Sequence, residues 1–283
     1  MKQALCSVAS NVEVAPGIHL MWIETPDIAV AALPGQFITV RCGDFTLRRP
    51  FSIHQASSRE IALLFKVAGK GTLWLSQRQK GDRIDIFGPL GKGFSIPPTK
   101  SGQSKHLLLV AGGIGIAPLV LLAQRASSQH QMTLIHGKTT AAQLYPFSSA
   151  GKKQTKLSPL PNGVQFIPVT EDGSMGKKGM ATDILPDFLD WADQIYACGP
   201  VDMYKAMALT LNPSPLKGEE KGEGEKRSNL KLRKCQVSLE VRMGCGFGAC
   251  YGCTINTKKG LKQVCRDGPV FELGDIIWRE VRI

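Results

Sequence analysis

The segment LLLVAGGIGIAPL, residues 107–119, decides the fold of this chain. Residues 105–110 have the length and composition of a buried strand, residues 112–115 form a glycine turn, and residues 118–126 can form a helix. Such a turn points backbone amides and the positive end of the helix dipole at a phosphate. The glycines lack the G-x-G-x-x-G spacing, so a plain tight turn is the alternative. We predict that a nucleotide binds at Gly112, Gly113, Gly115 and Pro118.

The alternation of strands and helices continues after this segment. Strands are predicted at residues 132–136, 165–169, 194–197 and 236–241, and helices at residues 182–191 and 201–211. Strands that alternate with helices indicate a parallel sheet. We therefore assign residues 99–241 to a nucleotide-binding α/β domain.

A second turn, Ala197-Cys198-Gly199-Pro200, follows one of these strands and begins the next helix. Parallel strands present their carboxyl ends at one edge of the sheet, where ligands bind. We therefore expect this turn to face the glycine turn. Cys198, as a catalytic residue, and Gly199 and Pro200 are predicted to lie beside a nicotinamide, although Cys198 can also be read as a small buried thiol.

The N-terminal third has a different pattern. Short runs rich in β-branched and aromatic residues, at 37–41, 61–67 and 83–87, are separated by Gly, Pro and Asp. This pattern predicts a small antiparallel barrel over residues 1–98, with one short helix at 72–79. Within it, Arg49-Pro50-Phe51-Ser52 offers a diphosphate clamp, an aromatic ring and a hydroxyl for a flavin. Gly71 and Thr72 stand where a helix start would meet a phosphate.

Four of the eight cysteines crowd into one segment, as Cys245-x4-Cys250-x2-Cys253 followed by Cys265. This is the plant-type spacing of a 2Fe–2S cluster. Tetrahedral zinc is the alternative, but zinc sites usually repeat C-x2-C twice and only one such pair is present. The other cysteines are scattered singly, which favours a reducing compartment over a disulfide framework. We expect a cytoplasmic protein and a cluster-binding unit at residues 242–283.

The net charge is +12, which alone could indicate a nucleic-acid partner. No basic helix or aromatic-interleaved stripe accompanies the charge, and glycines interrupt the longest apolar run. We expect neither a nucleic acid nor a membrane as a partner. Residues 212–229 combine Gly, Pro, Lys and Glu with almost nothing to bury, so they are predicted to be a disordered insertion.

Taken together, these motifs resemble the ferredoxin–NADP reductase superfamily in order along nearly the whole chain. The segments RMGCGFGACYGC, residues 242–253, and VCRDGPVF, residues 264–271, look like the electron-transfer subunit of B-type dihydroorotate dehydrogenase. The resemblance implies that FAD binds at Arg49 to Ser52, at Leu64, Phe65 and Lys66, and at Gly71 and Thr72. It also implies that a 2Fe–2S cluster binds at the four cysteines.

The same resemblance implies a partner and a reaction. An FMN-containing catalytic subunit would oxidise dihydroorotate in pyrimidine biosynthesis, in a heterotetramer with this chain. The nicotinamide preference is less clear, because residues 136–140 hold no acidic residue for a ribose hydroxyl and Lys138 would suit a 2′-phosphate. The resemblance favours NADH, with NADPH as the alternative.

Other proteins share this arrangement of motifs. A gamma subunit of a sulfhydrogenase or hydrogenase, or the small subunit of a ferredoxin:NADP oxidoreductase, would combine the same flavin, nucleotide and cluster sites. A redox-sensing module without turnover is a further alternative. Reduction of a dye by NADH would argue against the sensor, and orotate-linked activity with an FMN subunit would separate the enzymes.

Overall fold

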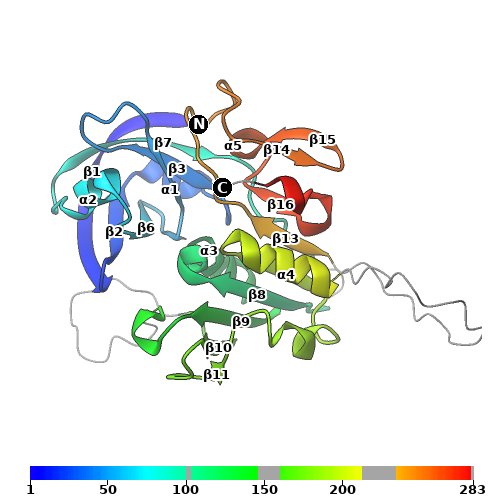
Figure 1. Cartoon of the computed structure of the whole chain (residues 1–283). Coiled ribbons are helices and arrows are strands. Elements are labelled where there is room, and N and C mark those ends of the chain that lie inside the picture. Colours follow the sequence, from blue (N-terminus) through cyan, green and yellow to red (C-terminus); the bar gives the residue numbers. More distant parts are fainter. Residues whose placement is uncertain (100–102, 146–159, 212–233, 282–283) are drawn as a thin grey trace, which may run out of the picture.

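The computed structural model describes residues 1–99, 103–145, 160–211 and 234–281. Two seven-stranded sheets account for most of the strands, and a two-stranded hairpin lies near the C-terminus. Figure 1 shows the N-terminal sheet and the C-terminal unit side by side, with the second sheet next to both. The predicted insertion at 212–229 lies outside the described residues. In the part of the chain that is described, no helix is long and apolar enough to cross a membrane.

The N-terminal sheet is antiparallel and curled, in the order β4-β3-β7-β1-β2-β6-β5. In β7 the buried positions alternate with more exposed ones, as expected for a strand with one face on a core. Its elements are β1 (Lys2–Ala15), β2 (Ile18–Glu24), α1 (Pro26–Ala31), β3 (Phe37–Arg41), β4 (Arg49–Ser52), β5 (Gln55–Ala56), β6 (Glu60–Lys66), α2 (Lys70–Ser76) and β7 (Arg83–Leu90).

The predicted strands and short helix of this region are confirmed, but the sequence did not reveal β1 and β2. These two strands form a long hairpin around Gly17, whose φ of +69° suits a glycine. Polar residues such as Ser10 and Asn11 interrupt the apolar pattern of β1 where it is only half-buried, so periodicity alone gave no signal.

The second sheet has the order β11-β10-β9-β8-β12-β13-β16, and all of its pairs are parallel except β13 with β16. The predicted parallel sheet is therefore a mixed one. Its elements are β8 (His106–Gly112), α3 (Ile116–Ala126), β9 (Gln131–Lys138), β10 (Val164–Thr170), β11 (Lys177–Lys178), β12 (Gln194–Cys198), α4 (Val201–Leu211), β13 (Cys235–Ser238) and β16 (Val270–Glu272).

Two predictions for this region are wrong in detail. Residues 182–191 form turns and one short 3₁₀ segment, Leu185–Phe188, in place of an α-helix. Pro186 stands within that segment and has no N–H to donate, which works against an α-helical ladder. The predicted last strand at 236–241 ends at Ser238, and the edge of the sheet is formed instead by β16 from the C-terminal unit.

The core explains how the parts are joined. Alternate residues of β8 point into two different buried clusters, so the two faces of the sheet have separate cores. On one face Leu119 of α3 packs with Leu20 and Leu64 of the N-terminal sheet. On the other face Met207 of α4 packs in the cluster that contains Cys253 and Cys265. The N-terminal sheet and the C-terminal unit are therefore both anchored to the second sheet by apolar contact.

The C-terminal unit contains little regular structure. A hairpin of β14 (Thr254–Thr257) and β15 (Gly260–Gln263) is followed by the short helix α5 (Val264–Asp267), and β16 then returns to the large sheet. The 3₁₀ segments Leu273–Asp275 and Trp278–Glu280 follow.

Candidate functional site

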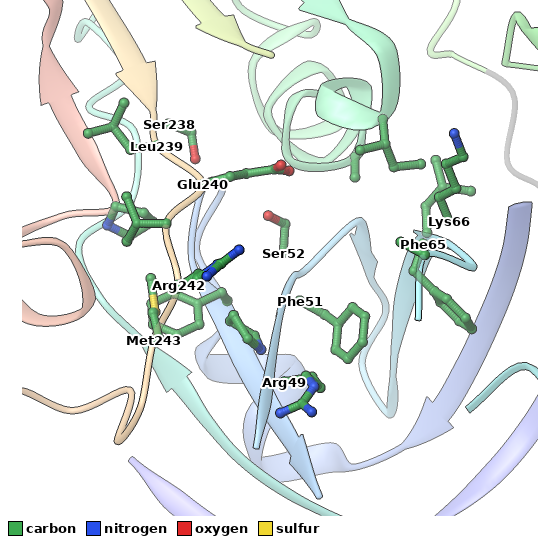
Figure 2. A pocket seen from close by; sticks show the side chains of 18 of the residues that line it. Arg49, Phe51, Ser52, Phe65, Lys66, Ser238, Leu239, Glu240, Arg242 and Met243 are labelled. Atoms are coloured by element: carbon green, nitrogen blue, oxygen red, sulfur yellow. The ribbon is translucent and has the colours of Figure 1, made fainter. Parts of the chain in front are cut away.

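A cavity of about 670 Å³ lies where the three parts of the chain meet. This volume falls within the range of small-molecule and cofactor sites. Figure 2 shows side chains from the N-terminal sheet on one side and from residues 238–243 on the other. The lining includes these seven residues of the predicted flavin site: Arg49, Pro50, Phe51, Ser52, Leu64, Phe65 and Lys66.

Arg48 and Arg49, which begin this motif, differ in whether their charge is free to bind an anion. Arg48 forms an ion pair with Asp85, and the side chains of both are mostly buried. Arg49 makes a hydrogen bond to the Leu47 carbonyl and lies over the Phe45 ring, with no ion pair among the described residues. Arg49 therefore keeps its charge available for an anion such as a diphosphate.

Two aromatic rings form part of the same wall. Phe51 and Phe65 meet edge to face, with ring centroids 5.6 Å apart, and Phe65 is stacked on His19. Neighbouring strands therefore hold both rings in fixed orientations. An apolar wall of this kind next to Ser52 suits a flat ring system with polar edges.

Gly71 and Thr72, which were predicted to meet a phosphate, lie at the start of α2 and have different surroundings there. A Cβ at Gly71 would stand 3.1 Å from Arg49 Nε, so glycine leaves the room that the guanidinium occupies. The Thr72 hydroxyl accepts the amides of Ala68 and Gly69 and donates to the Gly69 carbonyl. These bonds close the start of α2 internally, and neither residue lines the cavity.

The two turns predicted to bind the nicotinamide nucleotide do meet at the carboxyl edge of the sheet. Ala111 of β8 pairs with Cys198 of β12, and Cys198 pairs with Ser238 of β13. A Cβ at Gly112 would stand 2.8 Å from Pro200 Cδ, and a Cβ at Gly115 would stand 2.1 Å from the Cys198 carbonyl oxygen. Glycines are required there because the turns touch through their backbones, which the sequence alone did not reveal. Pro118 is buried in the first turn of α3.

Cys198 lies beneath this edge with only 1% of its surface exposed. Burial raises the pKa of its thiol, and the carboxylate of Glu240 raises it further. The thiol is therefore protonated at neutral pH. Its predicted place beside a nicotinamide rests on the position of the turn, not on thiol reactivity.

Residues 238–243, which we call the connector, were not recognised in the sequence. They begin at Ser238, the last residue of β13, and all six line the cavity. Figure 2 shows Glu240 of the connector and Ser52 pointing into the same part of the cavity. Desolvation by the cavity walls raises the pKa of Glu240, although its surface stays open to the cavity. No motif in the sequence marks this carboxylate.

A second acidic residue near the nucleotide edge was also missed. The Glu171 amide donates to the Lys138 carbonyl, and the Glu171 carboxylate accepts a hydrogen bond from Thr139 at 3.2 Å. An acidic residue that directly follows strand β10 therefore lies beside residues 136–140. Lys138 is half-buried, and burial together with the nearby Lys66 lowers its pKa.

The connector runs directly into the cysteine-rich loop. Gly246 and Gly248 have φ values of +82° and +95°, which glycine adopts readily. Phe247 meets Phe87 of the N-terminal sheet edge to face at 5.9 Å, and Gln263 donates to the Gly248 carbonyl. The loop is thus held between the barrel strand β7 and the C-terminal hairpin.

Two of the four cysteine sulfurs accept hydrogen bonds from backbone amides. The Cys245 sulfur accepts the amides of Ala249 and Cys250, and the Cys253 sulfur accepts the amide of Cys265. Cys253 and Cys265 are buried, whereas Cys245 is half-buried and Cys250 is exposed. Within the described residues no group of three or more His, Cys, Asp or Glu is drawn together tightly enough to hold a single metal ion.

The chemistry of these sulfurs suits a cluster with two irons. Partial burial acts to raise the pKa of Cys245, but the amides of Phe247, Cys250 and Ala249 lower it to about 6. Burial and the neighbouring Cys253 raise the pKa of Cys265 to about 12. Cys245 is therefore ready to ligate as a thiolate, and positive charge from iron would be needed to deprotonate Cys265. Four cysteine sulfurs, two of which accept backbone amides, fit the ligand set of a 2Fe–2S cluster.

The chain matches two family models. Residues 240–277 match the iron–sulfur cluster binding domain of dihydroorotate dehydrogenase B, and residues 109–208 match the oxidoreductase NAD-binding domain. The first model covers the connector from Glu240 onward and the cysteine loop, and the second spans both turns at the sheet edge.

Curated relatives and solved structures extend the similarity over the whole chain. The electron transfer subunit of dihydroorotate dehydrogenase B (NAD(+)) from Desulforamulus reducens is 38% identical over 94% of both chains. The protein of that name from Caldanaerobacter subterraneus is 33% identical over 96% of this chain and 97% of its own. A solved NADH-dependent reduced ferredoxin-NADP oxidoreductase superposes with a TM-score of 0.77 at 26% identity, covering 98% of this chain and 91% of that chain.

A ferredoxin NADP+ reductase from Neisseria gonorrhoeae, solved with bound FAD and NADP, shares the fold alone, with a TM-score of 0.58 at 16% identity. It covers 77% of this chain and 95% of its own.

The fold and the site together define an oxidoreductase with a ferredoxin reductase-like fold, an NAD-binding domain and an iron–sulfur cluster binding domain. Within that class, the chain belongs to the family of dihydroorotate dehydrogenase B electron transfer subunits.

Proposed function

We propose that this chain oxidises NADH at FAD and passes the electrons through a 2Fe–2S cluster to the FMN-containing catalytic subunit of dihydroorotate dehydrogenase. The same path runs in reverse when the catalytic subunit oxidises dihydroorotate to orotate, and NAD+ then accepts the electrons. The observation that carries the proposal is the connector, because one stretch of six residues lines the cavity and leads straight to Cys245. The names of the curated relatives support the NADH and dihydroorotate assignments.

In this proposal the curled N-terminal sheet serves as the FAD-binding barrel. Arg49 binds the diphosphate, with Lys66 as a second cation in the wall. Phe51 and Phe65 hold the flavin ring in the apolar part of the cavity, and Ser52 meets its polar edge. FAD accepts two electrons as hydride and can release them singly, which a one-electron cluster requires.

The two turns at the sheet edge then hold the nicotinamide nucleotide. The backbone contact of Gly115 with Cys198 fixes the turns against each other. Glu171 would accept a ribose hydroxyl at the end of β10, a role that favours NADH over NADPH. Cys198 gives the turn its shape by packing, and the neutral thiol takes no proton.

Cys245, Cys250, Cys253 and Cys265 are proposed as the ligands of the cluster. The exposed Cys250 and the exposed rings of Phe247 and Tyr251 mark the surface at which the catalytic subunit would dock. All eight cysteines are free, which supports our proposal of a cytoplasmic location. We also propose that the chain forms a heterotetramer with the catalytic subunit.

Reconstitution tests the proposal directly. The isolated chain, loaded with FAD and cluster, should reduce a dye with NADH and should not oxidise dihydroorotate. Mixing it with an FMN-type catalytic subunit should produce orotate with reduction of NAD+. Dye reduction without any orotate formation at saturating partner would refute the dihydroorotate assignment.

One observation favours a second candidate. The solved NADH-dependent reduced ferredoxin-NADP oxidoreductase matches nearly the whole chain. A small subunit of that kind would pass electrons to a ferredoxin-linked partner. Reduction of ferredoxin or NADP+ that depends on a partner flavoprotein would support this candidate, whereas orotate formation favours the first.

A further inference from the structure

Tyr204 is a fully buried tyrosine of α4 that lies outside the cavity and outside every motif of the sequence. Its hydroxyl accepts a hydrogen bond from the Gly199 amide at 2.9 Å and donates one to the Ser238 carbonyl at 2.6 Å. The hydroxyl is thus used as donor and acceptor at once. Burial, and then the nearby Cys198, raise the pKa of Tyr204 well above its ordinary value, so the phenol always carries the proton that it donates.

The two backbone groups that it joins belong to different parts of the site. Gly199 is in the Cys-Gly-Pro turn, where a Cβ would meet Met203 at 2.6 Å and the Cα of Gly112 at 3.1 Å. Ser238 is the first residue of the connector, which lines the cavity and continues to the cysteine loop. One hydroxyl group therefore bridges the nicotinamide side and the flavin side of the site.

The ring of Tyr204 makes a third connection. It is stacked on Trp278 of the C-terminal unit, with centroids 5.2 Å apart and planes inclined by 30°. The indole of Trp278 is fixed in turn by its hydrogen bond to the Leu273 carbonyl. The orientation of the phenol is thus determined by the unit that carries the cysteines.

We propose that Tyr204 is a positioning residue that sets the distance between the Cys-Gly-Pro turn and the flavin-lining connector, and so the approach of the nicotinamide to the flavin. This inference rests on the proposed function, because it assigns the turn to the nicotinamide. The physical reason is that removing the hydroxyl leaves a buried amide and a buried carbonyl without this partner, which favours a shift of both segments. Hydride transfer is sensitive to such shifts, since a displacement of about 1 Å can cost on the order of 100-fold in rate.

The chain offers a matched control. Tyr196 of β12 is also fully buried, and its hydroxyl donates one hydrogen bond, to the Ser95 carbonyl at 2.9 Å. Tyr196→Phe removes the same group from a similar environment without touching either turn or the connector. Comparison of Tyr204→Phe with Tyr196→Phe therefore separates positioning from general loss of stability.

The experiment uses the holoprotein with FAD and cluster loaded, whose absorption spectra should match the wild type in both variants. Thermal unfolding should show comparable destabilisation of the two. Anaerobic stopped-flow mixing with NADH should show flavin reduction slowed about tenfold in Tyr204→Phe and less than twofold in Tyr196→Phe. Binding of NAD+ to the reduced protein should also give a weaker long-wavelength absorbance, which reports stacking of nicotinamide on flavin, in Tyr204→Phe alone.

Equal flavin reduction rates and equal long-wavelength absorbance in the two variants would show that Tyr204 has only a structural role. If Tyr204→Phe does not yield holoprotein, Trp278→Phe tests the same point, because it leaves the hydroxyl bonds and removes only part of the stacked ring. It should weaken the long-wavelength absorbance, and an unchanged signal would overturn the proposal. A wild-type flavin that NADH fails to reduce would refute the proposed function, and this inference with it.

Discussion

Replacing Gly115 with alanine should separate the two turns at the nucleotide edge. The Cβ would stand 2.1 Å from the carbonyl oxygen of Cys198, 2.4 Å from its carbonyl carbon and 2.7 Å from the Gly199 amide nitrogen. All three are backbone atoms, so no side-chain rotation can relieve the contact. The φ of Gly115 is −61°, which alanine adopts freely, so steric overlap is the whole effect.

The size of the effect follows from the geometry. An ordinary contact at this position needs about 3.4 Å, so the turns must part by roughly 1 Å. Overpacking of this kind typically costs about 1–3 kcal/mol of stability. A displacement of about 1 Å next to the reacting groups costs on the order of 100-fold in rate. We therefore expect a modest fall in melting temperature and a large fall in the rate of flavin reduction by NADH.

Gly163→Ala is the control. Gly163 has a φ of +92° and no neighbour within 4 Å, so alanine there strains the backbone without displacing either turn. Both variants should lose similar stability by thermal unfolding, and only Gly115→Ala should slow flavin reduction in anaerobic stopped-flow. Wild-type flavin reduction in Gly115→Ala would show that the contact between the turns does not position the nicotinamide.

Three other perturbations test separate parts of the site. Burial lowers the pKa of His54 to about 4, against an ordinary value of about 6.5. Between these pH values the unfolded state binds more protons than the folded state, so the folded state loses stability as the pH decreases. On going from pH 7 to pH 5, His54 should lower the free energy of unfolding of the wild type by about 2 kcal/mol. The melting temperature of His54→Asn should therefore fall about 4 °C less than that of the wild type over this range. Parallel curves of melting temperature against pH for the two proteins would contradict the lowered pKa of His54. Cys250→Ser should abolish the cluster absorbance while FAD stays bound, and loss of both cofactors would show that the sites are not independent. Arg266→Glu, at an exposed position beside the cysteine loop, should slow electron transfer to the catalytic subunit severalfold while sparing dye reduction, and a parallel fall in both activities with intact cluster would refute docking there.

The parts of the fold that the sequence predicted are those whose signal is local. The strand, glycine turn and helix at 107–126 lie within twenty consecutive residues, and the structure has them as β8, a 3₁₀ turn and α3. The short strands of the N-terminal region and α4 were likewise confirmed. The predicted flavin residues from Arg49 to Ser52 and from Leu64 to Lys66 meet in one cavity, because the curl of the sheet brings β4 into contact with β6 although other strands lie between them in the sheet order.

The parts that were missed depend on contacts between distant segments. β16 has three residues and is a strand only because β13, more than thirty residues earlier, offers an edge. Glu240 belongs to the site because it faces Ser52 across the cavity. The residues next to Glu240 and Ser52 in the sequence do not indicate that the two side chains face each other. His54 similarly bonds the Ala117 carbonyl and the Tyr145 hydroxyl, which belong to another domain. A single sequence without aligned relatives contains no pattern that identifies such pairs.

The connector explains why this chain needs no large motion to move electrons from flavin to cluster. Met243 lines the cavity and Cys245 follows two residues later. Two residues span at most about 7 Å, so the first cysteine of the loop cannot lie far from the flavin wall. At its other end the connector begins at Ser238, which Tyr204 bonds together with the nicotinamide turn. The Tyr204 hydroxyl therefore joins the proposed nicotinamide turn to the connector, and the connector leads from the proposed flavin wall to the proposed cluster ligands.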